Sequence, residues 1–568
     1  MKTVAGHAAS AGIAIGPLFV YRAPTLGVER RAVDDVEAEL ARYDDVRERV
    51  ARELRALAAA LVERGRDEEA AIFEIQLEFL EDPTFGEEIR SRIESEELLG
   101  ESATRLVTDE LVAEFSEIDD EYFAGRATDI RDLGGRMIRR LSGIENDPFD
   151  DVSEPSIILA HDLTPSDTVS MDRTKVLALC TEIGSATSHT AIIARSLGIP
   201  AIVGLGALDV DSRAPAIVDA VEGRLIVEPD TETVSTYRAR KDDFDSRRTH
   251  LLQRAREPAR TTDGALIEVV ANIGGAEDAR QAIEHGAEGV GLLRTEFLFL
   301  DRATLPDEEE QYRVYRQIVD LFERRPVVVR TLDVGGDKPL PSVPMPAESN
   351  PFLGQRAIRL ALDDPERLLL PQLRALLRAS HDRNLKIMFP MVATSGEVKR
   401  LQAALAGVRV ELNRRGVPYA RDVEIGIMVE IPAAAVAARR LARLVDFFSI
   451  GTNDLTQYIL AADRTNERVA TLADSFEPAV LNVIRMVIDA AHGEGKRVGM
   501  CGEMAGDPLA IPLLLGMGLD EFSMSPSAIP DAKERLRALS REALRDVVSQ
   551  CLDAESAAEV RSVLARVS

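Results

Sequence analysis

The second half of the chain alternates strand-like apolar runs with helical stretches of similar length, and no other feature constrains the fold as strongly. Eight such runs follow residue 260, namely ALIEVVANI, GVGLLRTE, VVVRTLDVGG, LKIMFPMV, EIGIMVEI, FFSIGTND, KRVGMCGE and DEFSMSP. Strands separated by helices predict parallel pairing, and eight repeats in roughly 310 residues fit a closed (β/α)8 TIM-type barrel. An open, doubly wound sheet is the alternative, because a count of strands does not establish closure.

The first half of the chain has a different pattern. From about residue 33 to residue 140 it is rich in Ala, Leu, Glu and Arg, with apolar residues at helical spacing. Shorter, glycine-punctuated runs flank this block, such as AGIAIGPLFVY before it and KVLALCTEI after it, and they are typical of strands. We therefore predict a multidomain α/β protein: a small α/β domain over 1–24 and 145–230, an all-helical insertion over 25–144, a helical linker over 231–257 and the barrel over 258–568.

One segment of the small domain, GSATSHTAIIARSLGIPAIVG over 184–204, places His189 at the predicted start of a helix. Hydroxyl side chains precede the helix and can cap it, and Gly198 with Pro200 ends it before a strand. The unpaired amides of a helix N-terminus attract phosphate, so an imidazole there is a candidate phosphoryl acceptor. A capping or packing histidine is the competing interpretation.

Polar side chains gather where the barrel strands are predicted to end, which is the functional face of such barrels. Arginines in this position suit phosphate and carboxylate groups, and Glu430 with Asp454 could hold a magnesium ion. Cys501 is a candidate proton donor, although a buried cysteine that acts as a small hydrophobe is the alternative. The pattern favours a small phosphorylated acid as substrate. These polar residues are Arg294, Glu296, Arg330, Asp333, Lys338, Arg356, Glu430, Asn453, Asp454, Arg464, Cys501 and Glu503.

The composition narrows the class of protein further. The net charge is −28, arginine supplies most of the positive charge, and the acidic residues are spread along the helical segments. Such a surface suits high salt, which predicts a halophilic source, with an ordinary acidic cytosolic protein as the alternative. The same acidic charge excludes nucleic-acid binding through a basic stripe on the surface. We expect a cytoplasmic protein, because no apolar run could span a bilayer and MKTVAGHAAS lacks signal-peptide features.

Together the motifs resemble enzyme I of the phosphoenolpyruvate-dependent phosphotransferase system, and the resemblance covers nearly the whole chain. The order and spacing of several motifs make it specific. The motifs are DLTPSDT, TSHTAIIARSLGIPAIVG, GVGLLRTEFLFL, RTLDVGGDKPLP, NPFLGQRAIR, EIGIMVEIP, FFSIGTNDLTQY and MCGEMAGDP.

The resemblance implies that His189 accepts the phosphoryl group of phosphoenolpyruvate, near the hydroxyl of Thr168, and passes it to HPr. HPr is a small phosphocarrier protein, which is expected to dock on the helical insertion. Cys501 is implied as the acid that protonates the enolate carbon to give pyruvate, with Mg²⁺ as cofactor. A homodimer through the barrel and a swing of the small domain between barrel and carrier are also implied. The remaining residues assigned in this way are Arg294, Arg330, Arg356, Asn453 and Arg464 for substrate, and Glu430 and Asp454 for metal. Lys338, in the glycine-rich VGGDK that follows the third strand, is a further candidate for substrate binding.

The chain departs from the family pattern at two positions, and rival functions share the same fold. Gln76 occupies a position where many relatives have histidine, and this difference bears on the details of carrier docking. Gln355 occupies a position where a large aromatic residue is common. A dikinase acting on phosphoenolpyruvate or pyruvate is one rival, but it needs a nucleotide-binding domain, and no glycine-rich nucleotide loop is found here. A non-catalytic regulatory protein on this fold is the other. Sugar uptake or dihydroxyacetone phosphorylation could lie downstream.

Overall fold

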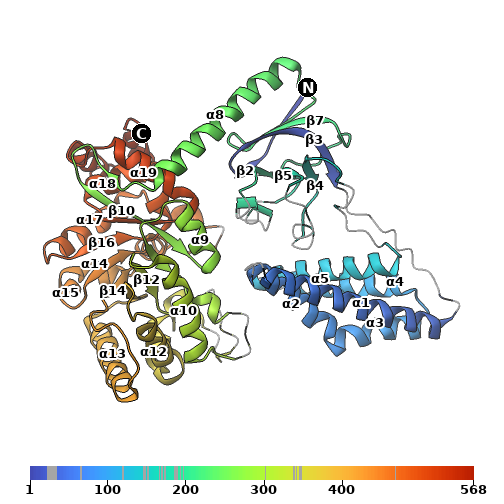
Figure 1. The fold of residues 1–568 in the computed structure, drawn as a ribbon, viewed down its shortest axis with the longest axis horizontal. Coiled ribbons are helices and arrows are strands. Elements are labelled where there is room, and N and C mark those ends of the chain that lie inside the picture. The colour runs from blue at the N-terminus through green and yellow to red at the C-terminus, as the bar shows by residue number, and fades with distance from the viewer. Residues whose placement is uncertain are drawn as a thin grey trace. The chain divides into compact units, whose positions relative to one another are not determined.

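The computed structural model forms two compact units, an N-terminal unit of residues 1–248 and a C-terminal unit of residues 249–568 (Figure 1). The structure describes residues 1–21, 33, 35–63, 67–117, 121–144, 149, 152–164, 167, 171, 174–184, 190–191, 194–195, 198–300, 302, 304–336, 340, 342–343, 348–466 and 468–567. Within these ranges, the backbone alone is described at 60–63, 67–71, 116–117, 121–126 and 128.

The N-terminal unit contains an eight-stranded mixed sheet in the order β1-β8-β7-β3-β4-β5-β6-β2. Strands β3 to β6 pair in parallel, and their neighbours pair antiparallel. β3 lies directly beside β4 although the helical block separates them in the sequence, which confirms an α/β domain interrupted by an insertion. The strands are β1 (Lys2–Ala5), β2 (His7–Ser10), β3 (Ile13–Tyr21), β4 (Ser156–Ala160), β5 (Val176–Thr181), β6 (Ala201–Val203), β7 (Pro215–Asp219) and β8 (Arg224–Val227).

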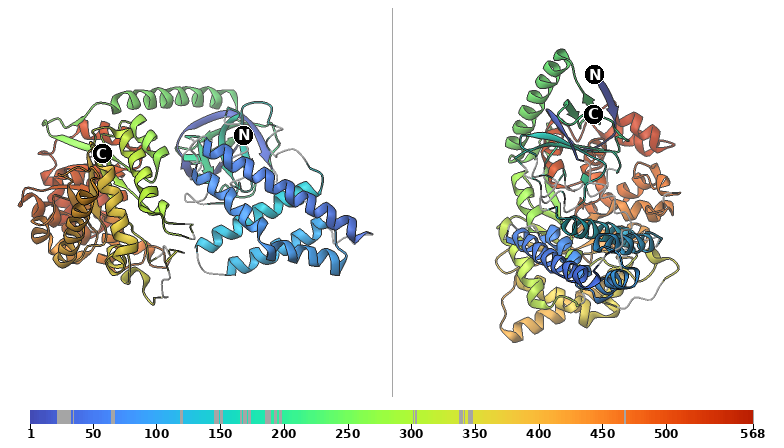
Figure 2. Two further views of the ribbon diagram at one scale, coloured as in Figure 1. Left: turned by 60° about the horizontal axis from the view of Figure 1, so that its bottom comes forward. Right: turned by 90° about the vertical axis from the view of Figure 1, so that its right-hand side faces the viewer.

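The insertion consists of helices that lie alongside one another as a bundle (Figure 2). In α1, Tyr43, Val50 and Leu54 recur at helical spacing and are fully buried, so the apolar stripe in the sequence faces the bundle core. Asp82 caps the start of α3 by accepting from the amide of Thr84. The helices are α1 (Val36–Glu63), α2 (Asp67–Glu81), α3 (Pro83–Glu96), α4 (Gly100–Glu117) and α5 (Glu121–Leu141).

The predicted linker is a helix, α8 (Thr231–Ala255). Its first half belongs to the N-terminal unit, where Tyr237 packs in an apolar cluster with Ile13 of the sheet. Its last turn belongs to the C-terminal unit, where the fully buried Lys533 donates to the carbonyls of Ala255 and Gly286 at 2.9 and 2.8 Å. A buried ammonium that satisfies C-terminal carbonyls stabilises the end of this helix.

All eight predicted strands of the C-terminal unit form, and they close into a parallel barrel. Closure follows from β10, which pairs in parallel with both β11 and β17. The open sheet is therefore excluded. The strands are β10 (Leu266–Ile273), β11 (Val290–Leu293), β12 (Val327–Arg330), β13 (Leu385–Phe389), β14 (Ile425–Val429), β15 (Phe447–Ile450), β16 (Arg497–Met500) and β17 (Glu521–Met524), preceded by the short β9 (Ala259–Arg260).

Helices surround the barrel, and the apolar side chains between the two layers form the largest core of the protein (Figure 1). A smaller apolar cluster fills the interior of the barrel and includes Met388, Phe447 and Cys501. The helices are α9 (Ala276–Glu284), α10 (Glu308–Phe322), α11 (Ile358–Asp363), α12 (Leu370–Ala379), α13 (Ser395–Arg415), α14 (Pro432–Val436), α15 (Ala438–Ala442), α16 (Thr452–Leu460), α17 (Pro478–His492), α18 (Ala510–Met517), α19 (Ile529–Ala538), α20 (Arg545–Leu552) and α21 (Ala557–Leu564).

Candidate active site

A cavity of about 130 Å³ opens where the barrel strands end. Its walls come from β11, β12 and β14 and from the segments that follow these three strands, β15 and β16. These segments are distant in the sequence, so closure of the barrel is what brings them together. Eight predicted site residues line it, namely Arg294, Arg330, Arg356, Glu430, Asn453, Asp454, Arg464 and Cys501.

Arg330 is the last residue of β12, and two carboxylates hold it in the cavity wall. Its Nη2 donates to Glu296 Oε1 at 2.8 Å, and its Nη1 lies 3.1 Å from Asp333 Oδ2. Its Nε is buried without a hydrogen-bond partner among the described residues. A buried guanidinium N–H that lacks a partner beside a cavity is available for an anionic ligand.

Arg356 is fixed from two sides. Nε and Nη2 donate to the two oxygens of Asp333 at 2.9 and 3.0 Å, and Nη1 and Nη2 donate to those of Asp454 at 2.8 and 3.2 Å. Such paired contacts fix the plane of the guanidinium. Arg464 adds a longer contact, with Nη1 3.6 Å from Asp454 Oδ2. Asp333 therefore joins Arg330 to Arg356, a role that its position at the end of a strand did not reveal.

The backbone beside Arg356 is as constrained as its side chain. Gly335 has a φ of +103°, and a Cβ built there would lie 2.5 Å from the carbonyl oxygen of Gln355 and 3.0 Å from Cα of Arg356. Ala357 has a φ of 53°, in the left-handed region. Glycine at 335 thus lets its loop approach the backbone of Gln355 and Arg356 closely, which positions Arg356.

Glu430, at the end of β14, is only 1 % exposed, and its Oε1 accepts from the amide of Met391 at 2.6 Å. Burial, reinforced by the nearby charges of Asp454 and Asp333, raises the pKa of Glu430 to about 8. Buried carboxylates that disfavour their own ionisation attract a cation. Glu430 and Asp454 thus fit a metal ion, although no described group of three or more His, Cys, Asp or Glu side chains could hold one.

Cys501 follows β16 and belongs to the apolar cluster inside the barrel, while it also lines the cavity. Burial raises the pKa of its thiol to about 11. Its Sγ lies 3.8 Å from the carbonyl oxygen of Ile450. At neutral pH the thiol therefore keeps its proton, which suits an acid and disfavours a thiolate nucleophile.

Two amide side chains organise the ends of neighbouring strands. Asn453 Nδ2 donates to Glu503 Oε1 at 3.1 Å, and the amide of Glu503 donates back to Asn453 Oδ1 at 3.2 Å. Sequence reasoning missed Asn272 of β10, whose Nδ2 donates to the carbonyls of Cys501 and Ser523 at 2.9 and 3.3 Å. The sequence did contain a signal for Asn272, since a single amide side chain lies near the end of the otherwise apolar run VVANI.

Three predicted site residues, His189, Thr168 and Lys338, lie outside the described residues. The described part of the His189 segment agrees with the predicted helix. Thr190 and Ala191 are helical, and the amides of Gly198 and Ile199 donate to the carbonyls of Arg195 and Ala194 at 3.2 and 3.0 Å. Gly198 has a φ of +65°, so glycine ends this helix as the sequence predicts.

The two departures from the family pattern have different surroundings. Gln76 is fully buried in the helical insertion and donates from Nε2 to Asp132 Oδ2 at 2.9 Å. Gln355 is exposed, and its Nε2 donates to Asp363 Oδ2 at 2.5 Å. Because Gln76 is buried, its side chain presents no polar group at the surface of the insertion.

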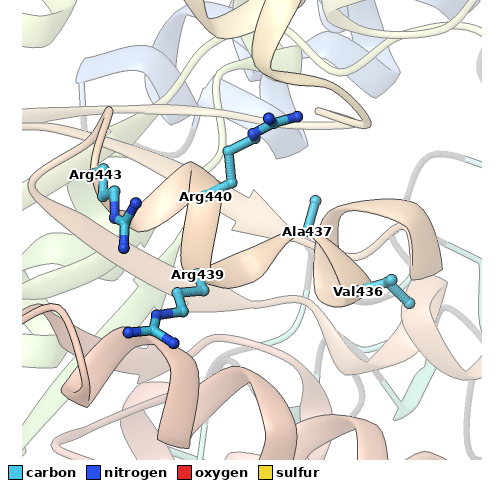
Figure 3. A pocket seen from close by; sticks show the side chains of 5 residues that line it. All are labelled: Val436, Ala437, Arg439, Arg440 and Arg443. Atoms are coloured by element: carbon cyan, nitrogen blue, oxygen red, sulfur yellow. The ribbon is translucent and has the colours of Figure 1, made fainter.

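A second depression of about 440 Å³ lies against α14 and α15 and is lined by Val436, Ala437, Arg439, Arg440 and Arg443 (Figure 3). Its arginines include none of the predicted site residues. Arg439 donates one hydrogen bond to Glu494 at 2.9 Å, and Arg443 donates two to it at 2.8 and 3.0 Å. These bonds join α15 to the turn after α17, which is a structural role.

Comparison with known proteins identifies this arrangement. Three family models match, described as PEP-utilising enzyme, N-terminal, over residues 5–126, PEP-utilising enzyme, mobile domain, over 152–223, and PEP-utilising enzyme, PEP-binding domain, over 248–541. Two relatives named phosphoenolpyruvate-protein phosphotransferase, from Bacillus sp. (strain S) and Geobacillus stearothermophilus, are each 46% identical over 567 residues, which is 100% of this chain and 98% of theirs. One from Bacillus subtilis (strain 168) is 45% identical over 99% of this chain and 98% of its own.

The chain therefore belongs to the phosphoenolpyruvate-utilising enzymes and, among them, to the family of the phosphoenolpyruvate-protein phosphotransferases. This confirms the family predicted from the motifs. A divalent metal ion is the class of cofactor that phosphoenolpyruvate-utilising enzymes require. The described residues contain no helix long and apolar enough to cross a membrane.

Proposed function

We propose that this protein transfers the phosphoryl group of phosphoenolpyruvate to its own His189 and then to HPr, releasing pyruvate. This would be the first step of a phosphotransferase system for carbohydrate uptake. One observation carries the proposal: the eight described residues predicted to bind substrate and metal and to donate a proton line a single cavity. The relatives that match over nearly their full length are named for this reaction, which favours it over a dikinase.

The arginines of the cavity are the groups that hold the substrate. Phosphoenolpyruvate carries a phosphate and a carboxylate, and planar guanidinium groups bind both through paired hydrogen bonds. Arg330 and Arg356 are already fixed by carboxylates, so little side-chain entropy is lost when substrate binds. Arg294, Arg464, Asn453 and Lys338 complete the proposed substrate contacts.

Glu430 and Asp454 would hold Mg²⁺ through their carboxylate oxygens, the type of ligand that this ion prefers. When bound, the ion supplies positive charge that stabilises the loose transition state of phosphoryl transfer. The fit rests on the two carboxylates that share the cavity and on the burial that raises the pKa of Glu430 to about 8. Asp454 also accepts from Arg356, which aligns it with the anion site.

Breaking the bond between phosphorus and the enol oxygen leaves the enolate of pyruvate, which needs a proton on its methylene carbon. Cys501 holds a proton at Sγ because burial raises the pKa of its thiol to about 11. We assign Cys501 as the donor of this proton. His189 acts as the nucleophile in its neutral form, and the hydroxyl of Thr168 is proposed to lie beside it.

His189 and the barrel cavity belong to different units, so the proposed reaction requires the small domain to move between the cavity and the carrier. A crosslink that holds the domain at the barrel should preserve self-phosphorylation and block transfer to HPr. Unimpaired transfer would exclude the motion. A homodimer through the barrel, which rests on the family resemblance, and a cytoplasmic location, which rests on the sequence, are further proposals.

The direct test uses labelled phosphoenolpyruvate with Mg²⁺, with and without HPr. We expect label on the wild-type protein, its passage to HPr when HPr is added, and no label on His189→Ala. Label on the His189→Ala protein would show that the nucleophile is another residue. Absence of label from the wild type would exclude the proposed function itself.

A further inference from the structure

A chain of hydrogen bonds crosses from the helical insertion to the loop that follows β4. Its centre is Asp132 on α5, a carboxylate that accepts a hydrogen bond at each of its two oxygens. Oδ2 accepts from Nε2 of Gln76 on α2 at 2.9 Å, and Oδ1 accepts from the hydroxyl of Thr164 at 3.2 Å. Gln76 and Asp132 are buried, so water does not compete with the bond between them, and Thr164 is half-buried.

Thr164 begins a tightly bonded turn. The amide of Asp167 donates to Thr164 Oγ1 at 3.2 Å, and the amide of Thr164 donates to Asp167 Oδ2 at 3.0 Å. This is the reciprocal pattern of a capping box. The other oxygen of Asp167 accepts from the hydroxyl of Tyr21 on β3 at 3.2 Å. Residue 168 follows Asp167 in the sequence, so the bonds of Thr164 and Asp167 act on the part of the chain that leads to Thr168.

Packing alone does not account for a glutamine at position 76. Its side chain is fully buried, and its Oε1 has no hydrogen-bond partner among the described residues. An unpaired buried carbonyl is unfavourable, and leucine would fill a similar volume without one. The bond to Asp132 is what glutamine provides and leucine does not.

The hydroxyl of Thr164 also makes one hydrogen bond more than the turn requires. A cap only has to accept a hydrogen bond, which Thr164 does from Asp167, yet its hydroxyl hydrogen is directed across to Asp132. The turn is therefore joined to α5 by a bond that serves no local purpose.

We propose that Gln76, Asp132 and Thr164 are positioning residues that fix the turn before Thr168 relative to the helical insertion. This inference rests on the proposed function, in which the insertion docks HPr and Thr168 lies beside His189. During the transfer step, a carrier held on the helices would meet the phosphohistidine correctly only if the two parts adopt the relation that these hydrogen bonds define, whereas loading at the barrel does not require it. Small misplacements of reacting groups reduce transfer rates strongly.

The test variant is Gln76→Leu in the full-length protein, loaded with labelled phosphoenolpyruvate and then mixed with HPr. We expect phosphoryl transfer at saturating HPr to slow about tenfold, while loading by phosphoenolpyruvate stays at the wild-type rate. The melting temperature does not discriminate, because the variant removes the unpaired Oε1 but also removes the donor to the buried Oδ2 of Asp132. A purely structural glutamine predicts an unchanged transfer rate, whatever the melting temperature.

Conservative variants separate the hydrogen bonds from the charge. Asp132→Asn keeps an acceptor for Thr164 and can bond a flipped Gln76 amide, so it should transfer at the wild-type rate, whereas Asp132→Ala should be slow. Thr164→Ser should be normal and Thr164→Val slow. Thr108→Val is the matched control, since Thr108 is a buried residue of the insertion whose hydroxyl lacks a partner among the described residues.

The outcomes separate this inference from the function on which it depends. A wild-type protein that is not loaded or does not pass label to HPr contradicts the proposed function. The wild type can transfer normally while Gln76→Leu is equally fast or is impaired only in its KM for HPr. That result overturns the proposed positioning role and leaves the proposed function intact. Independent effects of Gln76→Leu and Thr164→Val in the double variant would also overturn it, because linked residues are not additive.

Discussion

At the scale of single residues, burial sets the chemistry of Cys501. Burial raises its pKa to about 11, so the thiol is protonated at neutral pH. We expect Cys501→Ala to slow pyruvate formation about a hundredfold or more, the range typical of a lost general acid. Pyruvate release measured with a coupled assay checks this, and Cys551→Ala, at another buried cysteine, should keep the wild-type rate. Equal rates for the two variants would remove Cys501 from the mechanism.

Glu430 makes the stability of the metal-free protein depend on pH. Burial and neighbouring carboxylates raise its pKa from 4.5 to about 8, so between these values the unfolded chain loses its proton and the folded protein keeps it. The folded state then binds more protons, and its stability falls as pH rises through this window. We expect Glu430→Gln to flatten the decline in melting temperature from about pH 5 to about pH 8. Parallel curves for the two proteins would show that Glu430 ionises normally.

At the scale of elements, the loop after β12 depends on one glycine. Alanine at 335 would adopt an unfavourable φ and contact Arg356 and the carbonyl of Gln355. We expect Gly335→Ala to raise the KM for phosphoenolpyruvate about tenfold or more by displacing Arg356. Gly407→Ala is the matched control: it lies within α13 with nothing within 4 Å of the added Cβ and should stabilise the helix by up to about 1 kcal/mol. An unchanged KM for Gly335→Ala would mean that Arg356 does not depend on this loop.

The elements themselves could be predicted from the sequence, and their contacts could not. Apolar runs punctuated by glycine located the strands, because strands buried in a parallel barrel are apolar on both faces. The bonds of Arg356 to Asp454, 98 residues further on, depend on loops with unusual backbone angles, such as Ala357 at a φ of 53°. No pattern of residue types specifies such angles. The buried hydrogen bond between Gln76 and Asp132 could not be predicted either, since it depends on how two helices pack.

At the scale of the whole molecule, the acidic groups that give the net charge of −28 repel one another. Salt screens this repulsion by shortening the Debye length from about 10 Å at 0.1 M to about 3 Å at 1 M. We expect the melting temperature to rise between these concentrations of KCl, as the predicted halophilic source requires. A flat or falling curve would favour the alternative of an ordinary acidic protein.

The site was predictable as a set of residues on one rim, because barrel closure alone places strand ends together. How the carboxylates Glu296 and Asp333 fix the arginines was not predictable, since an acid at a strand end serves equally well as a cap for the next helix. The structure thus adds the network that orients the predicted groups.

The central claim is that phosphoenolpyruvate binds in the cavity at the end of the barrel. The most direct measurement titrates phosphoenolpyruvate with Mg²⁺ into the wild type, Arg464→Met and Arg440→Met by calorimetry. Arg464 lines this cavity, and among the described residues its side chain makes only a long ion-pair contact, with Asp454, so its variant should fold; Arg440 lines the separate depression at α15. We expect at least about a tenfold weaker affinity for Arg464→Met and no change for Arg440→Met. Equal affinity for Arg464→Met and the wild type would contradict the claim.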